Sequence, residues 1–109
     1  MNVITLAGRV SSNPARRETT RGVVCEFRLA VECRPRIWIV VQTWGPLAGR
    51  TAQHVTSGRT VAVTGSLISE EFATRSGETI VRWYVRATSL TYLDKPPATA
   101  DDMVAEAAR

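Results

Sequence analysis

The stretch from residue 37 to residue 58, IWIVVQTWGPLAGRTAQHVTSG, restricts the fold of this 109-residue chain more than any other. Residues 37–44 favour a strand, and the Gly45-Pro46 pair that follows is typical of a helix start, with glycine as the N-cap. Gly58 marks the expected stop. The apolar face of this helix consists of Leu47, Ala48, Thr51, Ala52 and Val55. The sequence therefore predicts one short helix set directly behind a strand.

Strand-like segments surround this helix on both sides. In residues 23–32 the core-type side chains Phe27, Leu29 and Val31 alternate with outward ones, the period of a strand. Gly8 and Gly65 interrupt two other strand patterns, as expected at a bulge or a bend. The remaining predicted strands are residues 3–10, 60–69 and 79–92, with a short polar extended piece at 15–20 and a loop at 70–78.

Three strands, one helix and two further strands follow one another in this prediction. This is the order of an all-β OB-fold, a five-stranded Greek-key barrel with its helix between strands 3 and 4. The face built by strands 2 and 3 of such a barrel commonly holds oligonucleotides.

The charge of the chain is unevenly distributed. Residues 1–93 carry twelve arginines against six acidic residues, whereas residues 94–109 carry four acidic residues against two basic ones. A basic body attracts polyanions, with nucleic acid as the first candidate, although arginines that only solvate a small surface would give the same count. We predict a folded domain over residues 1–93 and a short, disordered, mildly acidic tail over residues 94–109.

Several classes of protein do not fit this sequence. Cys25 and Cys33 are expected to lie about 26 Å apart along one strand, too far for a disulfide, which fits a reducing cytoplasm. The first residues lead directly into a strand pattern, which predicts no signal peptide, and no apolar run approaches the roughly 20 residues of a membrane helix. With His54 as the single histidine, no pattern supports a catalytic triad, a metal site or a phosphate loop. We expect no enzymatic activity, no metal and no cofactor.

Two tryptophans lie six residues apart in the strand predicted for residues 37–44. Because strand side chains alternate between faces, Trp38 and Trp44 should point to the same side. In an arginine-rich chain, two indoles on one face predict a platform for flat rings, and single-stranded nucleic acid combines flat rings with negative charge. The alternatives are a core or subunit-interface position for Trp38 and packing against the helix start for Trp44.

The order of these segments resembles the bacterial-type single-stranded DNA-binding proteins. The matching pieces, which span about residues 3–93, are ITLAGRV at 4–10, Asn13-Pro14, Arg17, FRLAV at 27–31, Trp38 to Gly45, Leu47-Ala48, SGRTVAVTG at 57–65, Leu67 and Gly77. No single piece is specific, but their order and spacing along the chain are.

The resemblance implies a non-enzymatic protein that coats single-stranded DNA in replication, recombination and repair and works as a tetramer or a dimer. Trp38 and Trp44 match two stacking aromatic residues of the family. Phe72, in the loop predicted for residues 70–78, matches a third, with a hydrophobic anchor as its alternative. Arg17 matches a basic position near the first turn.

The chain also departs from the family pattern. The connection at residues 33–36 is shorter than the usual hairpin, and Glu70 and Glu71 precede Phe72 where many members are basic. Pro46 stands where a lysine is common. The tail ends Ala-Ala-Arg and lacks the acidic Pro-Phe tip that recruits other replication and repair proteins. These departures point to a specialised paralogue, or to a plasmid or phage protein.

Basic residues complete the predicted site. Arg9 and Arg28 alternate away from apolar neighbours, which predicts an outer face, and Tyr84 is expected to share one face of the last strand with its flanking arginines. Trp83 alternates with apolar residues, so we interpret it as a core or dimer contact. The candidates for phosphate contact are Arg9, Arg17, Arg28, Arg34, Arg36, Arg82 and Arg86.

The sequence therefore predicts a cytoplasmic, nucleoid-associated homo-oligomer that binds single-stranded DNA without strong sequence preference. One alternative is an OB-fold adaptor for a replication protein, as in primosome assembly, which Glu70 and Glu71 favour slightly. The other is single-stranded RNA binding, because stacking and phosphate contacts do not separate RNA from DNA unless a group recognises the 2′-hydroxyl.

Overall fold

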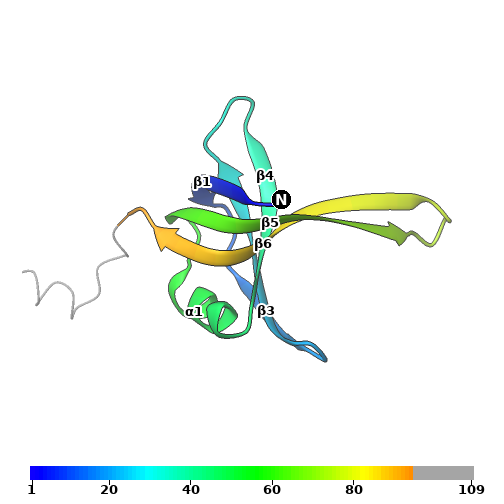
Figure 1. Cartoon of the computed structure of the whole chain (residues 1–109), viewed down its shortest axis with the longest axis horizontal. Coiled ribbons are helices and arrows are strands. Elements are labelled where there is room, and N and C mark those ends of the chain that lie inside the picture. The colour runs from blue at the N-terminus through cyan, green and yellow to red at the C-terminus, as the bar shows by residue number, and fades with distance from the viewer. Residues whose placement is uncertain (95–109) are drawn as a thin grey trace, which may run out of the picture.

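Six strands and one helix make up the fold, and the computed structural model describes residues 1–94 (Figure 1). The elements are β1 (Ile4–Val10), β2 (Ala15–Thr19), β3 (Gly22–Val31), β4 (Ile37–Trp44), α1 (Pro46–His54), β5 (Thr60–Ala73) and β6 (Thr79–Tyr92). The tail predicted for residues 94–109 lies outside the described residues, except for Asp94. In residues 1–94, no helix has both the length and the apolar character needed to cross a membrane.

Five of the strands close into a ring. The sheet order is β1-β5-β6-β4-β3-β2, and an additional pairing of β1 with β3 closes the ring, with β2 attached outside it at β3. All pairings are antiparallel except that of β4 with β6. This closed barrel confirms the predicted OB-fold. The short extended piece at residues 15–20 forms β2, so the helix follows the fourth strand instead of the third.

Two glycines allow the strands to bend where the barrel closes. Gly8 is paired with both Val31 of β3 and Val61 of β5, and a Cβ atom there would collide with the carbonyl oxygen of Ala30. At Gly65 a Cβ atom would collide with the carbonyl oxygen of Arg86, and the register of β5 against β6 shifts between Thr64 and Gly65. Both predicted interruptions are therefore confirmed as close backbone approaches.

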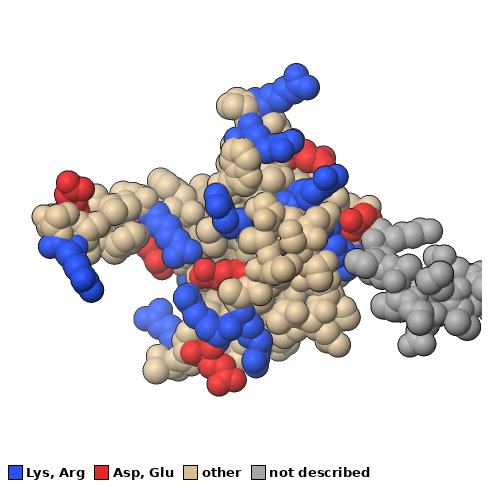
Figure 2. Space-filling view, turned by 180° about the vertical axis from the view of Figure 1, so that it is seen from behind, with Lys and Arg blue, Asp and Glu red and all other residues tan. Residues whose placement is uncertain are grey.

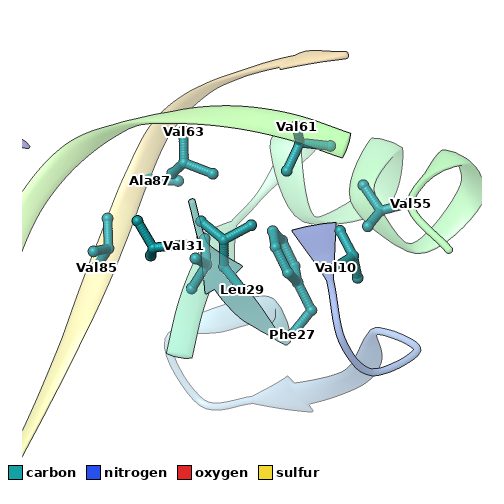
Figure 3. Close-up of a cluster of buried hydrophobic side chains, with 10 residues drawn as sticks. Val10, Phe27, Leu29, Val31, Val55, Val61, Val63, Val85 and Ala87 are labelled. Carbon is teal, nitrogen blue, oxygen red and sulfur yellow. The ribbon is translucent and has the colours of Figure 1, made fainter. Parts of the chain in front are cut away.

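Aliphatic side chains from every wall of the barrel fill its interior (Figure 3). The alternating residues of β3, Phe27, Leu29 and Val31, are buried as predicted. The rest of the buried cluster is Val10, Val41, Val55, Val61, Val63, Val85 and Ala87. This core leaves the outer faces of β3, β4 and β6 available for other contacts.

Helix α1 begins as the sequence predicts and ends earlier. Gly45 is the N-cap residue with φ 61°, a left-handed conformation that favours glycine, and Pro46 is the first helical residue. Ala48 and Thr51 are buried against the barrel, but Ala52 of the predicted apolar face is exposed. The helix ends at His54, and Gly58 lies in the following turn instead of at the helix end.

A two-stranded arm extends from the barrel, formed by the distal halves of β5 and β6 (Figure 1). The loop predicted at residues 70–78 is wrong for its first part, because Glu70 to Ala73 pair with Arg82 to Thr79 and continue β5. Glutamate has low strand propensity, but opposite residues such as Ile80 and Val81 favour the strand and supply the hydrogen-bonding partner. The connection itself spans only residues 74–78.

The side chain of Asp94 reinforces the pairing of the end of β6 with the start of β5. Asp94 accepts a hydrogen bond from the backbone N–H of Thr60 at 3.0 Å and pairs with Arg59 at 3.4 Å. Arg59 is itself buried and lies over the ring of Tyr92, with its guanidinium carbon 4.0 Å from the ring centroid. These contacts of Asp94 and Arg59 hold the start of β5 against the end of β6.

Candidate nucleic-acid interface

The outer face of β4 carries both tryptophans. Ile39 and Val41 pack into the core, so the even-numbered residues point outward, and Trp38 and Trp44 share one face as predicted. The facing residues of β3 are Ala30 beside Trp38 and Val24 beside Trp44. Six residues of strand place the two indoles about 20 Å apart, at opposite ends of the face.

Trp38 occupies the end of this face near the β3–β4 hairpin. Its side chain is about half exposed, at 53%. It lines a pocket of about 340 Å³ together with Arg9 and Arg36, so the fold brings these three predicted residues together. This pocket, which Glu32 also lines, therefore combines an exposed stacking surface with two arginines.

Trp44 occupies the opposite end and is held in one orientation. Its indole Nε1–H donates a hydrogen bond to Oε1 of Gln42 at 2.7 Å, and the side chain is half-buried. It lines a pocket of about 400 Å³ with Arg86 and Arg21. Arg21 was not among the predicted residues, although its position in the turn before β3 places it at this end of the face.

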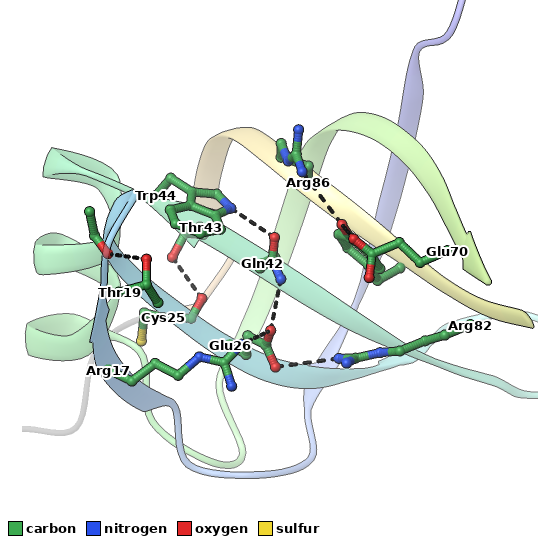
Figure 4. Close-up of polar contacts among 12 residues, drawn as sticks. Arg17, Thr19, Cys25, Glu26, Gln42, Thr43, Trp44, Glu70, Arg82 and Arg86 are labelled. Atoms are coloured by element: carbon green, nitrogen blue, oxygen red, sulfur yellow. Dashed lines mark hydrogen bonds and ion pairs between the residues drawn. The ribbon is translucent and has the colours of Figure 1, made fainter. Parts of the chain in front are cut away.

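A hydrogen-bonded cluster connects Trp44 with Gln42, Glu26 and two arginines (Figure 4). The carboxylate of Glu26 accepts hydrogen bonds from Gln42 Nε2 at 2.8 Å, from Arg17 Nη2 at 3.3 Å and from Arg82 Nη2 at 3.4 Å. Gln42 in turn accepts the hydrogen bond from Trp44. One acidic side chain therefore joins two predicted phosphate-binding arginines to a predicted stacking residue.

Phe72 lies on the arm, on β5 and not in a loop. It pairs with Ile80, and both side chains are exposed, at 48% and 42%. The period of two places Phe72 on the same side of the ribbon as Glu70 and, across the register, Arg82. This side continues the outer face that carries the tryptophans.

The remaining predicted arginines are exposed and more widely spread. Arg28 lies on β3 opposite Val40, between the two tryptophans, and Arg34 lies in the β3–β4 hairpin. Figure 2 shows basic side chains on this hairpin, on the arm and on the barrel, with acidic ones between them. On the face seen in Figure 2, the positive charge is thus interrupted by acidic side chains instead of forming one uninterrupted patch.

Comparison with known proteins assigns the family. The model of the Single-strand binding protein family matches residues 1–93, which is nearly the whole described part of the chain. The chain belongs to this family. The resemblance drawn from its sequence segments is thereby confirmed.

Two curated relatives are named single-stranded DNA-binding proteins. The single-stranded DNA-binding protein of Caldanaerobacter subterraneus subsp. tengcongensis is 36% identical over 86 residues, which are 71% of this chain and 57% of the relative. That of Thermotoga maritima is 32% identical over 108 residues, 89% of this chain and 77% of the relative. The chain thus spans a little over half the length of the first relative and about three quarters of the second.

A solved structure supports the fold of this family member independently. The crystal structure of a small single-stranded DNA-binding protein from Streptomyces coelicolor superimposes with a TM-score of 0.69 at 23% identity, covering 83% of this chain and 92% of the other. At this level of identity the likeness supports the barrel architecture.

Two aromatic predictions require correction in this family member. Tyr84, predicted to bind the ligand, shares a face with Arg82 and Arg86 but is 1% exposed. Val40 and Ile68 flank it in the register, and the Arg82 guanidinium lies over its ring at 5.6 Å. No ring face is therefore free for a base.

The hydroxyl of Tyr84 is also occupied. It donates a hydrogen bond to Glu70 at 2.7 Å and accepts one from Arg86 at 3.4 Å. Burial, followed by the contact with Glu70, raises the pKa of Tyr84 above its ordinary value. Tyr84 consequently supports the base of the arm, where it ties Glu70 to the barrel.

Trp83 is not a core residue. It is 57% exposed and pairs with Ser69 on the side of the arm opposite Phe72. The alternation with Val85 and Ala87 does indicate the core-facing side of β6, but the arm extends beyond the barrel, so this side meets solvent at Trp83. The dimer contact that the sequence also allowed stays a prediction.

The sequence analysis missed the two residues at the centre of the face. Gln42 lies between Trp38 and Trp44 in the same even-numbered series, and Glu26 has the same outward parity as Arg28 on β3. The period of two could have placed both. The hydrogen bonds between them depend on the register of β3 against β4, which pairs Glu26 directly with Gln42.

Both cysteines are free, as predicted, with Cys25 buried and Cys33 exposed. Among residues 1–94, no three His, Cys, Asp or Glu side chains gather closely enough to hold a metal ion. The chemistry that the face offers is accordingly stacking, hydrogen bonding and charge.

Proposed function

We infer that this protein binds single-stranded DNA without strong sequence preference. Bases stack on Trp38, Trp44 and Phe72, and the surrounding arginines contact the phosphates. The observation that carries this proposal is the placement of Trp38 and Trp44 on one outer face, each in a pocket with two arginines. Base stacking on aromatic side chains contributes about 1–3 kcal/mol per base and tolerates any sequence.

The preference for single strands follows from the same chemistry. Bases in a duplex are stacked on one another and present no free faces, so a platform of indoles gains nothing from them. Phosphate contacts add affinity that falls as salt rises, because bound counterions are released from the nucleic acid. The names of the curated relatives agree with this function.

In the cell, this activity protects exposed single strands in the cytoplasm during replication, recombination or repair. The work is binding, without a catalytic step. The protein acts as a homo-oligomer, because the side of the arm that carries Trp83 and Val81 leaves two large apolar residues about half exposed.

The deciding experiment is a titration of fluorescently labelled oligo(dT) of about 16 nucleotides, the upper range for one OB barrel. Anisotropy is measured for the wild type, Trp38→Ala and Trp44→Ala at several salt concentrations, with a duplex of the same length as control. We expect tight binding of oligo(dT) at low salt, weak binding of the duplex, and a loss in both variants.

Other outcomes identify the alternatives. Equal affinity for oligo(dT) and oligo(U) would extend the function to RNA. A folded protein that does not bind oligo(dT) at low salt would refute the proposal and favour an adaptor with a protein partner. Reversal of charge at Glu70 and Glu71 adds a second discriminator, because it should tighten DNA binding if the arm lies along the strand.

A further inference from the structure

The carboxylate of Glu26 occupies the middle of the proposed binding face. Its side chain is 20% exposed, whereas those of its partners Arg17 and Arg82 are 62% and 40% exposed. It comes from β3, while Arg17 comes from β2 and Arg82 from β6. A single negative charge on β3 is thus held where side chains from β2, β4 and β6 converge, beside the predicted path of the phosphates (Figure 4).

Glu26 makes weaker contacts with Arg17 and Arg82 than with Gln42. Each arginine uses one Nη2 atom, at 3.3 and 3.4 Å, and neither contact is bidentate. Gln42 donates at the shorter distance of 2.8 Å and is buried. The other donors of each guanidinium stay available, and such single, exposed ion pairs contribute little to stability. The arginines can therefore turn toward a phosphate while Glu26 remains in place.

We propose that Glu26 tunes the affinity of this face by cancelling one of the two charges that Arg17 and Arg82 present. This inference rests on the proposed function. A phosphate that approaches the pair meets a net charge of one instead of two, so binding is weaker and less sensitive to salt. The indoles are uncharged, and their contribution is left intact. Base stacking consequently determines which polyanion binds, because phosphate attraction alone contributes only modest affinity.

The test removes this charge and keeps the hydrogen bond. Glu26→Gln retains a carbonyl oxygen for Gln42 and is nearly identical in shape. With the same labelled oligo(dT), we expect roughly fivefold tighter binding at low salt. A plot of log affinity against log salt should become steeper by about 0.7, the value for one additional phosphate neutralised on a single strand. The gain should disappear at high salt.

A matched control is available on the neighbouring strand. Glu18→Gln makes the same change in net charge, but Glu18 pairs with Arg16 at 3.6 Å and lies at an exposed position of β2 away from Glu26. We expect Glu18→Gln to change the affinity less than twofold. An equal gain in oligo(dT) affinity in both variants would mean that only the net charge of the protein matters, and it would overturn the proposal.

Other outcomes distinguish a failure of the tuning role of Glu26 from a failure of the proposed DNA binding. If the wild type binds oligo(dT) and Glu26→Gln binds no more tightly, or more weakly, the tuning role is refuted and the function stands. If the wild type does not bind, the proposed function fails first. Glu26→Thr serves as a second neutral variant, and a loss of folding in both would assign Glu26 to stability and overturn the tuning role.

Discussion

Trp38 combines an exposed ring with a backbone that is fixed in the sheet, because β4 pairs with β3 along its whole length. Trp38→Leu removes the flat ring, whereas Trp38→Phe keeps one. We expect Trp38→Leu to weaken oligo(dT) binding by roughly fivefold to a hundredfold, the range for one stacked base. Trp38→Phe should retain most of the affinity.

Two measurements check the role of Trp38: thermal melting reports folding, and the oligo(dT) titration reports stacking. Thermal melting of Trp38→Leu should stay close to that of the wild type, because the side chain is 53% exposed. Equal affinity in the phenylalanine and leucine variants would remove Trp38 from the stacking residues.

Two cysteines with opposite surroundings give a second prediction at this scale. Burial raises the pKa of the Cys25 thiol, which keeps it protonated and unreactive, whereas Cys33 is exposed. Titration of the native protein with a disulfide reagent should therefore detect one thiol, and titration in denaturant should detect two. Cys33→Ser should lose the native reaction, and rapid labelling of native Cys33→Ser would contradict the burial of Cys25.

At the level of single residues, the sequence predicts which face of a strand a side chain occupies better than it predicts how exposed that side chain is. The period of two correctly placed Trp38 and Trp44 on one side, and the arginines of β6 on one side with Tyr84. Whether an outward residue is open depends on its neighbours across the sheet. Arg82 covers Tyr84 from the same strand, and Ile68 flanks it from β5. The exposure of an outward residue therefore depends on the register between strands that are distant in sequence. A local sequence pattern does not predict that register.

At the scale of the elements, β5 depends on the absence of a side chain at Gly65. Gly65→Ala would drive a Cβ atom into the carbonyl oxygen of Arg86, and we expect a loss of about 1–3 kcal/mol in unfolding free energy, as for overpacked cores. Gly49→Ala is the matched control, because nothing lies within 4 Å of a Cβ atom there. Within α1 it should stabilise the protein by up to about 1 kcal/mol.

Denaturant melts of both glycine variants distinguish these effects. The two substitutions add the same methyl group, so a general effect of alanine would shift both in one direction. A neutral Gly65→Ala would mean that β5 and β6 separate locally without cost at the bulge.

The junction of β5 and β6 should respond to acid through Asp94. The hydrogen bond from the Thr60 amide is the largest influence and lowers the pKa of Asp94 from 3.8, desolvation opposes it, and Arg59 lowers it further. Because the folded state binds the proton less tightly, the stabilisation is present above pH 3.8 and is lost as pH falls through the folded value.

Asp94→Asn should accordingly have a lower melting temperature than the wild type at neutral pH, and the difference should shrink in acid below that value. Thermal melts at a series of pH values measure it. A difference that stays constant between pH 7 and pH 2 would exclude ionisation of Asp94 as its cause.

Element boundaries were predictable where hydrophobic alternation is strong, as in β3, and failed where pairing overrides propensity. Residues 70–73 contain two glutamates that disfavour a strand, yet β6 holds them in register. Strand β2 has five exposed residues and no apolar period, so its sequence shows only an extended piece. In both cases a partner strand supplies the hydrogen bonds that the local sequence does not specify.

At the scale of the whole molecule, assembly is the open prediction. Trp83 and Val81 lie on the side of the arm opposite Phe72, with exposed fractions of 57% and 47%. We expect light scattering to give at least twice the 12.0 kDa of one chain, and Trp83→Lys to reduce the mass. Ile80→Lys, on the other side of the same arm, is the control. A wild-type mass of one chain at micromolar concentration would contradict the oligomer.

The closure of the barrel has a consequence for how the protein is made. Val40 of β4 pairs in parallel with Tyr84 of β6, 44 residues later, and the ring is incomplete until β6 has joined β4. Long-range pairing of this kind slows folding. Until the ribosome has released β6, one edge of the tryptophan-bearing strand has no neighbour and invites pairing with other chains. The outer face of β4 is therefore complete only after β6, the last strand within residues 1–94, has been synthesised and has paired.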